Sequence, residues 1–235
     1  MFGEKKTQRR SYRGILLDQN TDFAVTEAFK NIRTGMLYTA NSDRHPVYGV
    51  TSAFSGAGKS SVIANIAISF AQLGKKTLLI DCDMRAPTQH KIFKTPNREG
   101  LSELLAGIVT DPDSAVVPTG YDHLSLVTSG RIPPNPVELL ASDNFGNLID
   151  CFKQEFDCIF LDLPPVGVVS DALVASKKVQ GFVFVVRADA DDRTGVKESL
   201  RKLEQGGAAI LGFVLDDVDI KKGSGYYSSY GHSEK

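Results

Sequence analysis

The segment Ala53-Phe-Ser-Gly-Ala-Gly-Lys-Ser60 joins two apolar runs and constrains the fold more than any other part of the chain. Residues 46–52 before it are typical of a buried strand, and residues 61–67 after it are typical of a buried helix. Small residues let successive backbone N–H groups converge on an anion, a lysine reaches the outer phosphates, and a hydroxyl holds Mg²⁺. These groups are supplied by Gly56, Gly58, Lys59 and Ser60. The sequence therefore predicts a phosphate-binding loop between a strand and a helix.

Nucleotide contacts are expected along this loop and at the start of the helix behind it. The first position of the usual pattern is Ala53 instead of glycine, a departure that such loops tolerate. The helix N-terminus adds the positive end of its dipole to the anion site. The alternative, a turn that only joins a strand to a helix, is disfavoured by the flanking patterns. The predicted contacts are Ser55, Gly56, Ala57, Gly58, Lys59, Ser60 and Ser61.

Composition limits the class of protein. A chain of 235 residues with 42% hydrophobic residues suits one α/β domain with a sizeable core. A net charge of −1 offers no basic field for nucleic acid, so nucleic acid is not expected as a partner. Three cysteines without a C-x-x-C pair favour a reducing cytoplasm over a disulfide framework or a metal cluster. Because no run of about 18 apolar residues occurs, any membrane role is expected to come through a partner.

Apolar strand-like runs alternate with helical patterns through most of the chain. This order predicts a doubly wound, mainly parallel sheet. Together with the phosphate loop, it resembles the phosphate-loop NTPase architecture of the MinD and ParA proteins. We expect a basic N-terminal arm over residues 1–20, one domain over residues 21–217 and a flexible tail over residues 218–235. The arm either contacts an acidic partner or anionic lipid, or is a solvated tail, which we favour. The domain is expected to begin with a helix from Thr21 to about Asn41.

Two predicted strands end in carboxylates. Residues 76–82 lead into Asp81 and Asp83, and residues 157–162 end at Asp162. Open α/β sheets bind ligands at the carboxyl ends of their strands, where a carboxylate reaches Mg²⁺ directly or through water. Asp81 and Asp83 are two residues apart, so an extended strand end would direct both toward the phosphates. The predicted metal ligands are Ser60, Asp83 and Asp162, and Arg85 is either a charge clamp or a surface residue.

Taken together, these motifs resemble the bacterial tyrosine kinases of capsule and exopolysaccharide synthesis, in the stand-alone form that works with a separate membrane activator. The resemblance covers essentially residues 21–235. It rests on the phosphate loop, on Leu79-Ile-Asp-Cys-Asp-Met-Arg-Ala-Pro87, on Ile159-Phe-Leu-Asp-Leu-Pro-Pro165, on the Pro-Pro-Asn-Pro turn of residues 133–136 and on a tyrosine-bearing tail. The family often has proline and glutamate where this chain has Ser55 and Ala57, and asparagine where it has Asp216. Aspartate accepts a hydrogen bond from an adenine amino group but cannot donate one.

The resemblance implies phosphoryl transfer from ATP to tyrosine with Mg²⁺ as cofactor. The implied catalytic residues are Lys59, Asp81, Asp83 and Asp162, and Asp216 is the implied contact to the base. One of Asp81 and Asp83 accepts the proton of the incoming tyrosine while the other steers metal-bound water; we favour Asp81 as the base. The implied partners are the membrane activator, which recruits the cytoplasmic protein to the membrane, and a cognate tyrosine phosphatase.

Two further sites are implied. Glu27, Lys30 and Arg33 occupy the positions of a family contact between neighbouring subunits, which could close into a ring, although pairs within one solvated helix are the alternative. The acceptor tyrosines are Tyr226, Tyr227 and Tyr230 in the Gly/Ser-rich tail. A partitioning or septum-type ATPase switch is the second candidate, and a scaffold without turnover is the third. The early loop, residues 53–55, lacks the lysine that the ATPase switches carry.

Overall fold

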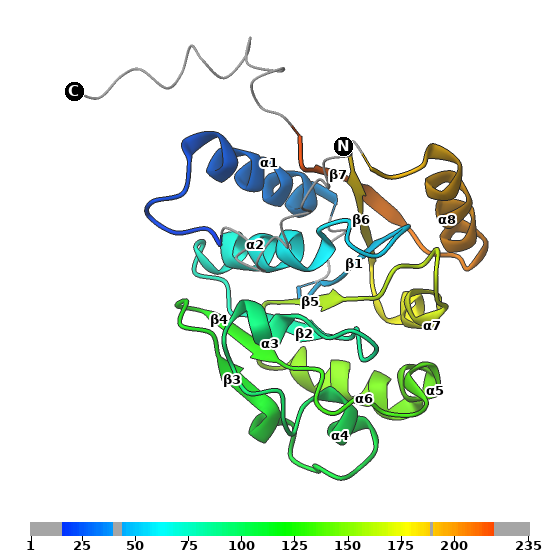
Figure 1. Cartoon of the computed structure of the whole chain (residues 1–235). Coiled ribbons are helices and arrows are strands. Elements are labelled where there is room, and N and C mark those ends of the chain that lie inside the picture. Colours follow the sequence, from blue (N-terminus) through cyan, green and yellow to red (C-terminus); the bar gives the residue numbers. More distant parts are fainter. Residues whose placement is uncertain (1–15, 40–43, 189, 219–235) are drawn as a thin grey trace, which may run out of the picture.

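A computed structural model describes residues 16–39, 44–188 and 190–218. A seven-stranded sheet crosses the molecule in the order β3-β4-β2-β5-β1-β6-β7 (Figure 1). All neighbouring strands are parallel except β3 and β4. The strands are β1 (Val47–Ser52), β2 (Thr77–Asp81), β3 (Val116–Pro118), β4 (Leu124–Val127), β5 (Cys158–Asp162), β6 (Gly181–Arg187) and β7 (Ile210–Asp216).

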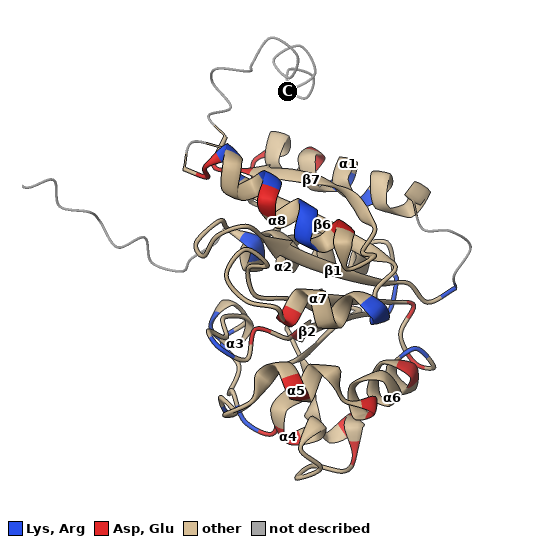
Figure 2. Ribbon diagram, turned by 90° about the vertical axis from the view of Figure 1, so that its right-hand side faces the viewer, with Lys and Arg blue, Asp and Glu red and all other residues tan. Residues whose placement is uncertain are grey.

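Helices cover both faces of this sheet, as in a doubly wound fold. Side chains from α1 (Phe23–Thr39) and α2 (Lys59–Ala71) share one apolar cluster with one face. The other face packs against α4 (Leu101–Leu105), α5 (Pro136–Ala141), α6 (Asp143–Phe152), α7 (Asp171–Ala175) and α8 (Arg193–Gln205). The short α3 (Gln89–Ile92) follows β2, and 3-10 turns cover Pro112–Ala115 and Ser176–Lys178. Positively and negatively charged side chains both occur along α8 (Figure 2).

Alternation along the strands explains the two clusters. Leu78 and Ile80 of β2 belong to the cluster beneath α4–α8, whereas Leu79 between them belongs to the cluster beneath α1 and α2. Every residue of β1, β2 and β5 is buried, as expected for central parallel strands. The predicted fold class is confirmed.

The strand β3 and the helix α3 are too short to be recognised from the sequence. The strand β3 has three residues with no buried position and ends in a proline, so no periodic pattern reveals it. The helix α3 has four residues, too few to show a helical period in the sequence. At the other end of the domain, Leu17 is buried and its N–H donates to Asn65 Oδ1 at 2.8 Å, so packing against α2 begins inside the stretch predicted as an arm.

Membrane-spanning helices do not occur in the described ranges, where every helix is too short or too polar to cross a bilayer. 

Candidate active site

Three strands bring the predicted motifs together at one edge of the sheet. The centre of the sheet is β2-β5-β1, so the chain leaves β1 for the phosphate loop beside the carboxyl ends of β2 and β5. Asp81 of β2 and Asp162 of β5 are register partners, and Asp162 is also the partner of Val50 in β1. The topology therefore places two carboxylates next to the loop.

Glycine is required at two positions of the loop. Gly56 and Gly58 have φ values of 81° and 86°, in the left-handed region that favours glycine. A Cβ at Gly58 would also run into the carboxylate of Asp216 at the end of β7. Thus Asp216, the predicted base contact, lies against the phosphate loop. Ser55 and Gly56 are exposed, Ala57 is buried, and Ser60 and Ser61 are partly buried at the start of α2.

The ammonium of Lys59 lies among three oxygens. Its Nζ is 3.0 Å from Asp83 Oδ2, 3.2 Å from Asp162 Oδ1 and 3.2 Å from Ser60 Oγ. Burial alone would lower the pKa of Lys59, but the charges of Asp162 and Asp83 outweigh it and raise the pKa above its usual value. The lysine is therefore a permanent cation that neutralises two buried carboxylates.

The same oxygens are of the chemical kind that could hold a magnesium ion. Hard oxygen donors from Asp83, Asp162 and Ser60 converge on one cationic nitrogen, and carboxylate and hydroxyl oxygens are the ligands that Mg²⁺ prefers. All three predicted metal ligands are thus in one place.

Asp81 is placed differently from Asp83. It is fully buried, and its Oδ2 accepts hydrogen bonds from the N–H groups of Thr88 and Gln89 at 3.0 and 2.9 Å. Because β2 ends at Asp81, the alternation expected of an extended strand does not continue to Asp83. Burial, together with the charge of Asp162, raises the pKa of Asp81 to about 8. Asp81 therefore holds a proton more readily than an ordinary aspartate.

Comparisons with known proteins agree with this geometry. Residues 48–228 match the model of the CobQ/CobB/MinD/ParA nucleotide binding domain. CapB of Staphylococcus aureus, named as a tyrosine-protein kinase, is 39% identical over 207 residues, which are 88% of this chain and 90% of CapB. The tyrosine-protein kinase CpsD of Streptococcus agalactiae is 35% identical over 211 residues, 89% of this chain and 91% of CpsD. The chain belongs to the family of the tyrosine-protein kinases CapB and CpsD.

Solved structures place the kinase in the same group. The chimerical protein CapA2B2 superposes with a TM-score of 0.82 at 38% identity, over 87% of this chain and 90% of the chimera. The septum site-determining protein MinD of Pyrococcus horikoshii superposes with a TM-score of 0.61 at 22% identity, over 73% of this chain and 70% of MinD, which shows a shared fold. The predicted family is confirmed, and so is its function in capsule or exopolysaccharide synthesis as a family property.

Two polar residues of the kinase site were not predicted. Gln89 is fully buried at the start of α3 and its Nε2 donates to Asp162 Oδ2 at 2.7 Å. Asp171 is fully buried at the start of α7 and accepts from Arg85 Nε at 3.1 Å. Arg85 is therefore paired with a carboxylate of its own chain. The sequence suggests either a charge clamp on the substrate or an unpaired surface residue, and this internal ion pair is a third arrangement. No motif marks either position in the sequence.

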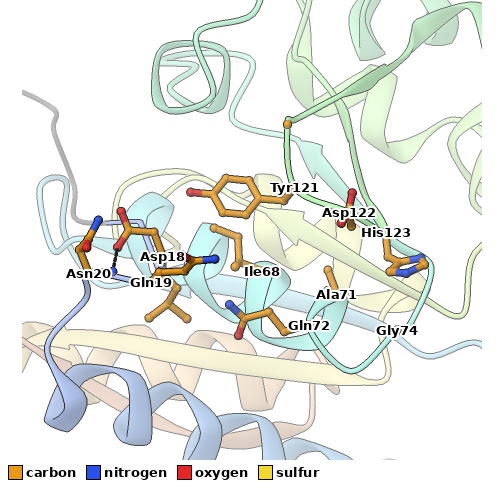
Figure 3. A pocket seen from close by; sticks show the side chains of 12 residues that line it. Asp18, Gln19, Asn20, Ile68, Ala71, Gln72, Gly74, Tyr121, Asp122 and His123 are labelled. Carbon is orange, nitrogen blue, oxygen red and sulfur yellow. Dashed lines mark hydrogen bonds between the residues drawn. The ribbon is translucent and has the colours of Figure 1, made fainter.

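Cavities lie both at the site and away from it. A concavity of about 270 Å³ beside the phosphate loop is lined by Phe54, Ser55, Gly56, Arg187 and residues 190–192. A larger one, of about 860 Å³, opens at the opposite edge of the sheet, where Tyr121, Gln72 and Asp18 surround Ile68 (Figure 3). None of the predicted catalytic residues lines the larger cavity.

The predicted subunit contact and the predicted acceptors stand outside this site. On α1, Lys30 Nζ pairs with Glu27 Oε1 at 2.8 Å, whereas Arg33 Nη1 donates to the backbone oxygen of Ser69 in α2 at 2.6 Å. A contact with a neighbouring subunit stays a prediction for these three residues. The acceptors Tyr226, Tyr227 and Tyr230 lie outside the described residues.

Proposed function

We propose that this kinase transfers the γ-phosphoryl group of ATP to tyrosines of its own C-terminal segment, with Mg²⁺ as cofactor. The observation that carries the proposal is the cluster of Lys59, Asp83, Asp162 and Ser60 behind the phosphate loop. Phosphoryl transfer needs positioning and charge neutralisation more than covalent chemistry by the protein. A buried lysine and convergent oxygen ligands supply both.

Each residue of the cluster has a proposed role. Lys59 binds the outer phosphate oxygens, since its raised pKa keeps it cationic. Ser60, Asp83 and Asp162 hold Mg²⁺, which when bound neutralises charge on the phosphates. The loop N–H groups from Ser55 to Ser61 bind the phosphates, and Asp216, which lies against Gly58, contacts the base.

Asp81 is proposed as the base that accepts the tyrosine proton. A pKa of about 8 suits a group that must take up a proton near neutral pH. Asp81 Oδ2 accepts the N–H groups of Thr88 and Gln89, and its Oδ1 accepts the N–H of Asp83 at 3.2 Å, so Oδ1, which has the fewer hydrogen bonds, is the oxygen proposed to take the proton. Asp83 is the other candidate, with its carboxylate already beside Lys59.

The acceptors are proposed to be Tyr226, Tyr227 and Tyr230. A flexible chain spans about 5–6 Å × √n, so some ten residues after Asp217 extend on the order of 17 Å. Because Asp216 lies against Gly58, the chain's own site is within this reach, and so is the site of a close neighbour. We propose phosphorylation between neighbouring subunits, within an oligomeric ring held through Glu27, Lys30 and Arg33. Each phosphate adds nearly two negative charges, which favours dissociation of the ring.

Partners are proposed from the resemblance and from one solved relative. The name of the chimera CapA2B2 joins an A component to a B component, which supports a second protein that works with the kinase. We propose a membrane activator that recruits a cytoplasmic kinase to the membrane, and a tyrosine phosphatase that reverses the reaction.

Mass spectrometry of the tail tests the proposed function. Incubation with Mg²⁺ and ATP is expected to place phosphate on Tyr226, Tyr227 or Tyr230, and Lys59→Met is expected to abolish it. Lys75→Met, at the exposed opposite end of β2, is the matched control and should retain wild-type labelling. Hydrolysis of ATP with an unmodified tail would favour the ATPase switch instead.

Light scattering tests the proposed ring. The triple variant Glu27→Ala/Lys30→Ala/Arg33→Ala should have a lower mass than wild type. Because Arg33 also donates to the backbone oxygen and to the hydroxyl of Ser69 within the chain, the double variant Glu27→Ala/Lys30→Ala, which keeps both internal hydrogen bonds, serves as the control. Equal masses for wild type and the triple variant would contradict the predicted interface.

A further inference from the structure

Gln89 joins the three motifs of the site. It is the first residue of α3 and is fully buried. Its backbone N–H donates to Asp81 Oδ2 at 2.9 Å, and its side-chain Nε2 donates to Asp162 Oδ2 at 2.7 Å and to the backbone oxygen of Ser60 at 3.0 Å. One residue thus contacts both acidic strand ends and the first turn of the helix behind the phosphate loop.

Chemistry fixes the orientation of this amide. Both hydrogens of Nε2 have acceptors, namely a carboxylate oxygen and a carbonyl oxygen. An amide turned by 180° would place Oε1 against two acceptors, which repel it. The amide therefore has one stable orientation, and glutamate at this position could not reproduce it in its charged form.

The amide determines how Asp162 presents its oxygens. Oδ2 is occupied by Gln89, while Oδ1 faces Lys59 Nζ at 3.2 Å. Because Asp162 is fully buried, water does not compete for either oxygen. The hydrogen bond from Gln89 thus fixes the rotation of the carboxylate, with Oδ1 toward the cation.

Oε1 of Gln89 is buried and has no hydrogen-bond partner among the described residues. An acceptor in this state is costly unless a ligand satisfies it. A hydrated cation beside Asp162 can donate the missing hydrogen bond. The geometry at Nε2 and the unpaired Oε1 are two independent signs that Gln89 belongs to the site.

We infer that Gln89 is a positioning residue, which holds Asp162 in the orientation that binds Mg²⁺ and ties this carboxylate to the phosphate loop through Ser60. The inference rests on the proposed function, because it assumes that Asp162 is a magnesium ligand. Residues that orient metal ligands typically change metal affinity or activity by roughly 10–100-fold when they are replaced.

Titration with ATP by calorimetry, with and without Mg²⁺, tests this inference. Gln89→Met keeps the length of the side chain and removes the amide, so the affinity gained on adding Mg²⁺ should fall by roughly 10–100-fold. Affinity for ATP without Mg²⁺ should fall by a clearly smaller factor, since the direct link of the Gln89 side chain to the phosphate-binding helix is its single hydrogen bond to the backbone oxygen of Ser60. Gln72→Met, an exposed glutamine at the far end of α2, is the control and should match wild type in both titrations.

The outcomes separate this inference from the proposed function. Equal losses with and without Mg²⁺, or no loss at all, would overturn the role of Gln89. Wild type that gains no affinity for ATP with Mg²⁺ would overturn the proposed function instead. If Gln89→Met does not fold, Gln89→Asn replaces it, because its side chain is one carbon shorter and places the amide out of reach of Asp162. The same two affinities for ATP, with and without Mg²⁺, are then compared with those of wild type.

Discussion

The two edges of the sheet differ in what they bury. At the carboxyl-terminal edge, Lys59, Asp81, Asp83 and Asp162 are at most 8% exposed and are joined by charge and hydrogen bonds. At the amino-terminal edge, the larger cavity of Figure 3 is lined by exposed polar residues such as Gln72, Asp122 and His123. Burial of charge costs free energy unless it is compensated, so the buried charges at the carboxyl-terminal edge are a stronger sign of function than the larger cavity at the other edge.

The largest effect expected at the carboxyl-terminal edge is on phosphoryl transfer. If Asp81 is the base, Asp81→Asn should lower the rate of tail phosphorylation by roughly 10²–10⁴-fold while nucleotide still binds. Quantified autophosphorylation of folded protein measures this effect. A variant that loses stability but keeps its rate would make Asp81 an anchor for the segment around Thr88, and the role of base would pass to Asp83.

A medium effect is expected on stability. Arg85→Leu leaves Asp171 buried without its cation, which should lower the free energy of unfolding by about 1–2 kcal/mol, less than for a fully buried pair because the side chain of Arg85 is 40% exposed. Urea denaturation measures the difference. The control is Arg131→Leu, whose side chain is 89% exposed and lies 4.0 Å from Glu103. Equal losses of unfolding free energy in both variants would mean that Arg85 stabilises the buried Asp171 no more than an exposed arginine does.

The smallest effect is expected at the amino-terminal edge. Gln72→Ala and Asp122→Ala change exposed side chains, so each should alter the free energy of unfolding by less than about 0.5 kcal/mol. Nucleotide affinity should be unchanged in both, as calorimetry would show. A tenfold loss of affinity in either variant would mean that the larger cavity communicates with the site.

Local patterns predicted the parts of the site that the chain itself keeps together. The glycine loop, Lys59 and Ser60 are neighbours in sequence, and Asp162 follows from a strand that must end at the same edge. Gln89 and Asp171 could not be predicted in this way. Their contacts depend on the path of residues 82–88 and on the packing of α7, neither of which leaves a period in the sequence.

The same difference applies to α1. A spacing of three residues correctly indicated that Glu27 and Lys30 could pair on one helix. The hydrogen bonds of Arg33 to Ser69 depend instead on how α1 crosses α2, which is a property of tertiary packing.

The contact between Gly58 and Asp216 also restricts how this family can vary. Gly58 is held to glycine both by its φ of 86° and by the carboxylate that occupies the space of a side chain. Conversely, residue 216 must be small enough to lie on the loop, which both aspartate and asparagine satisfy. The phosphate loop after β1 and the end of β7 thus constrain each other's mutations. An alignment of close relatives should show larger residues at position 216 only where the end of β7 has shifted.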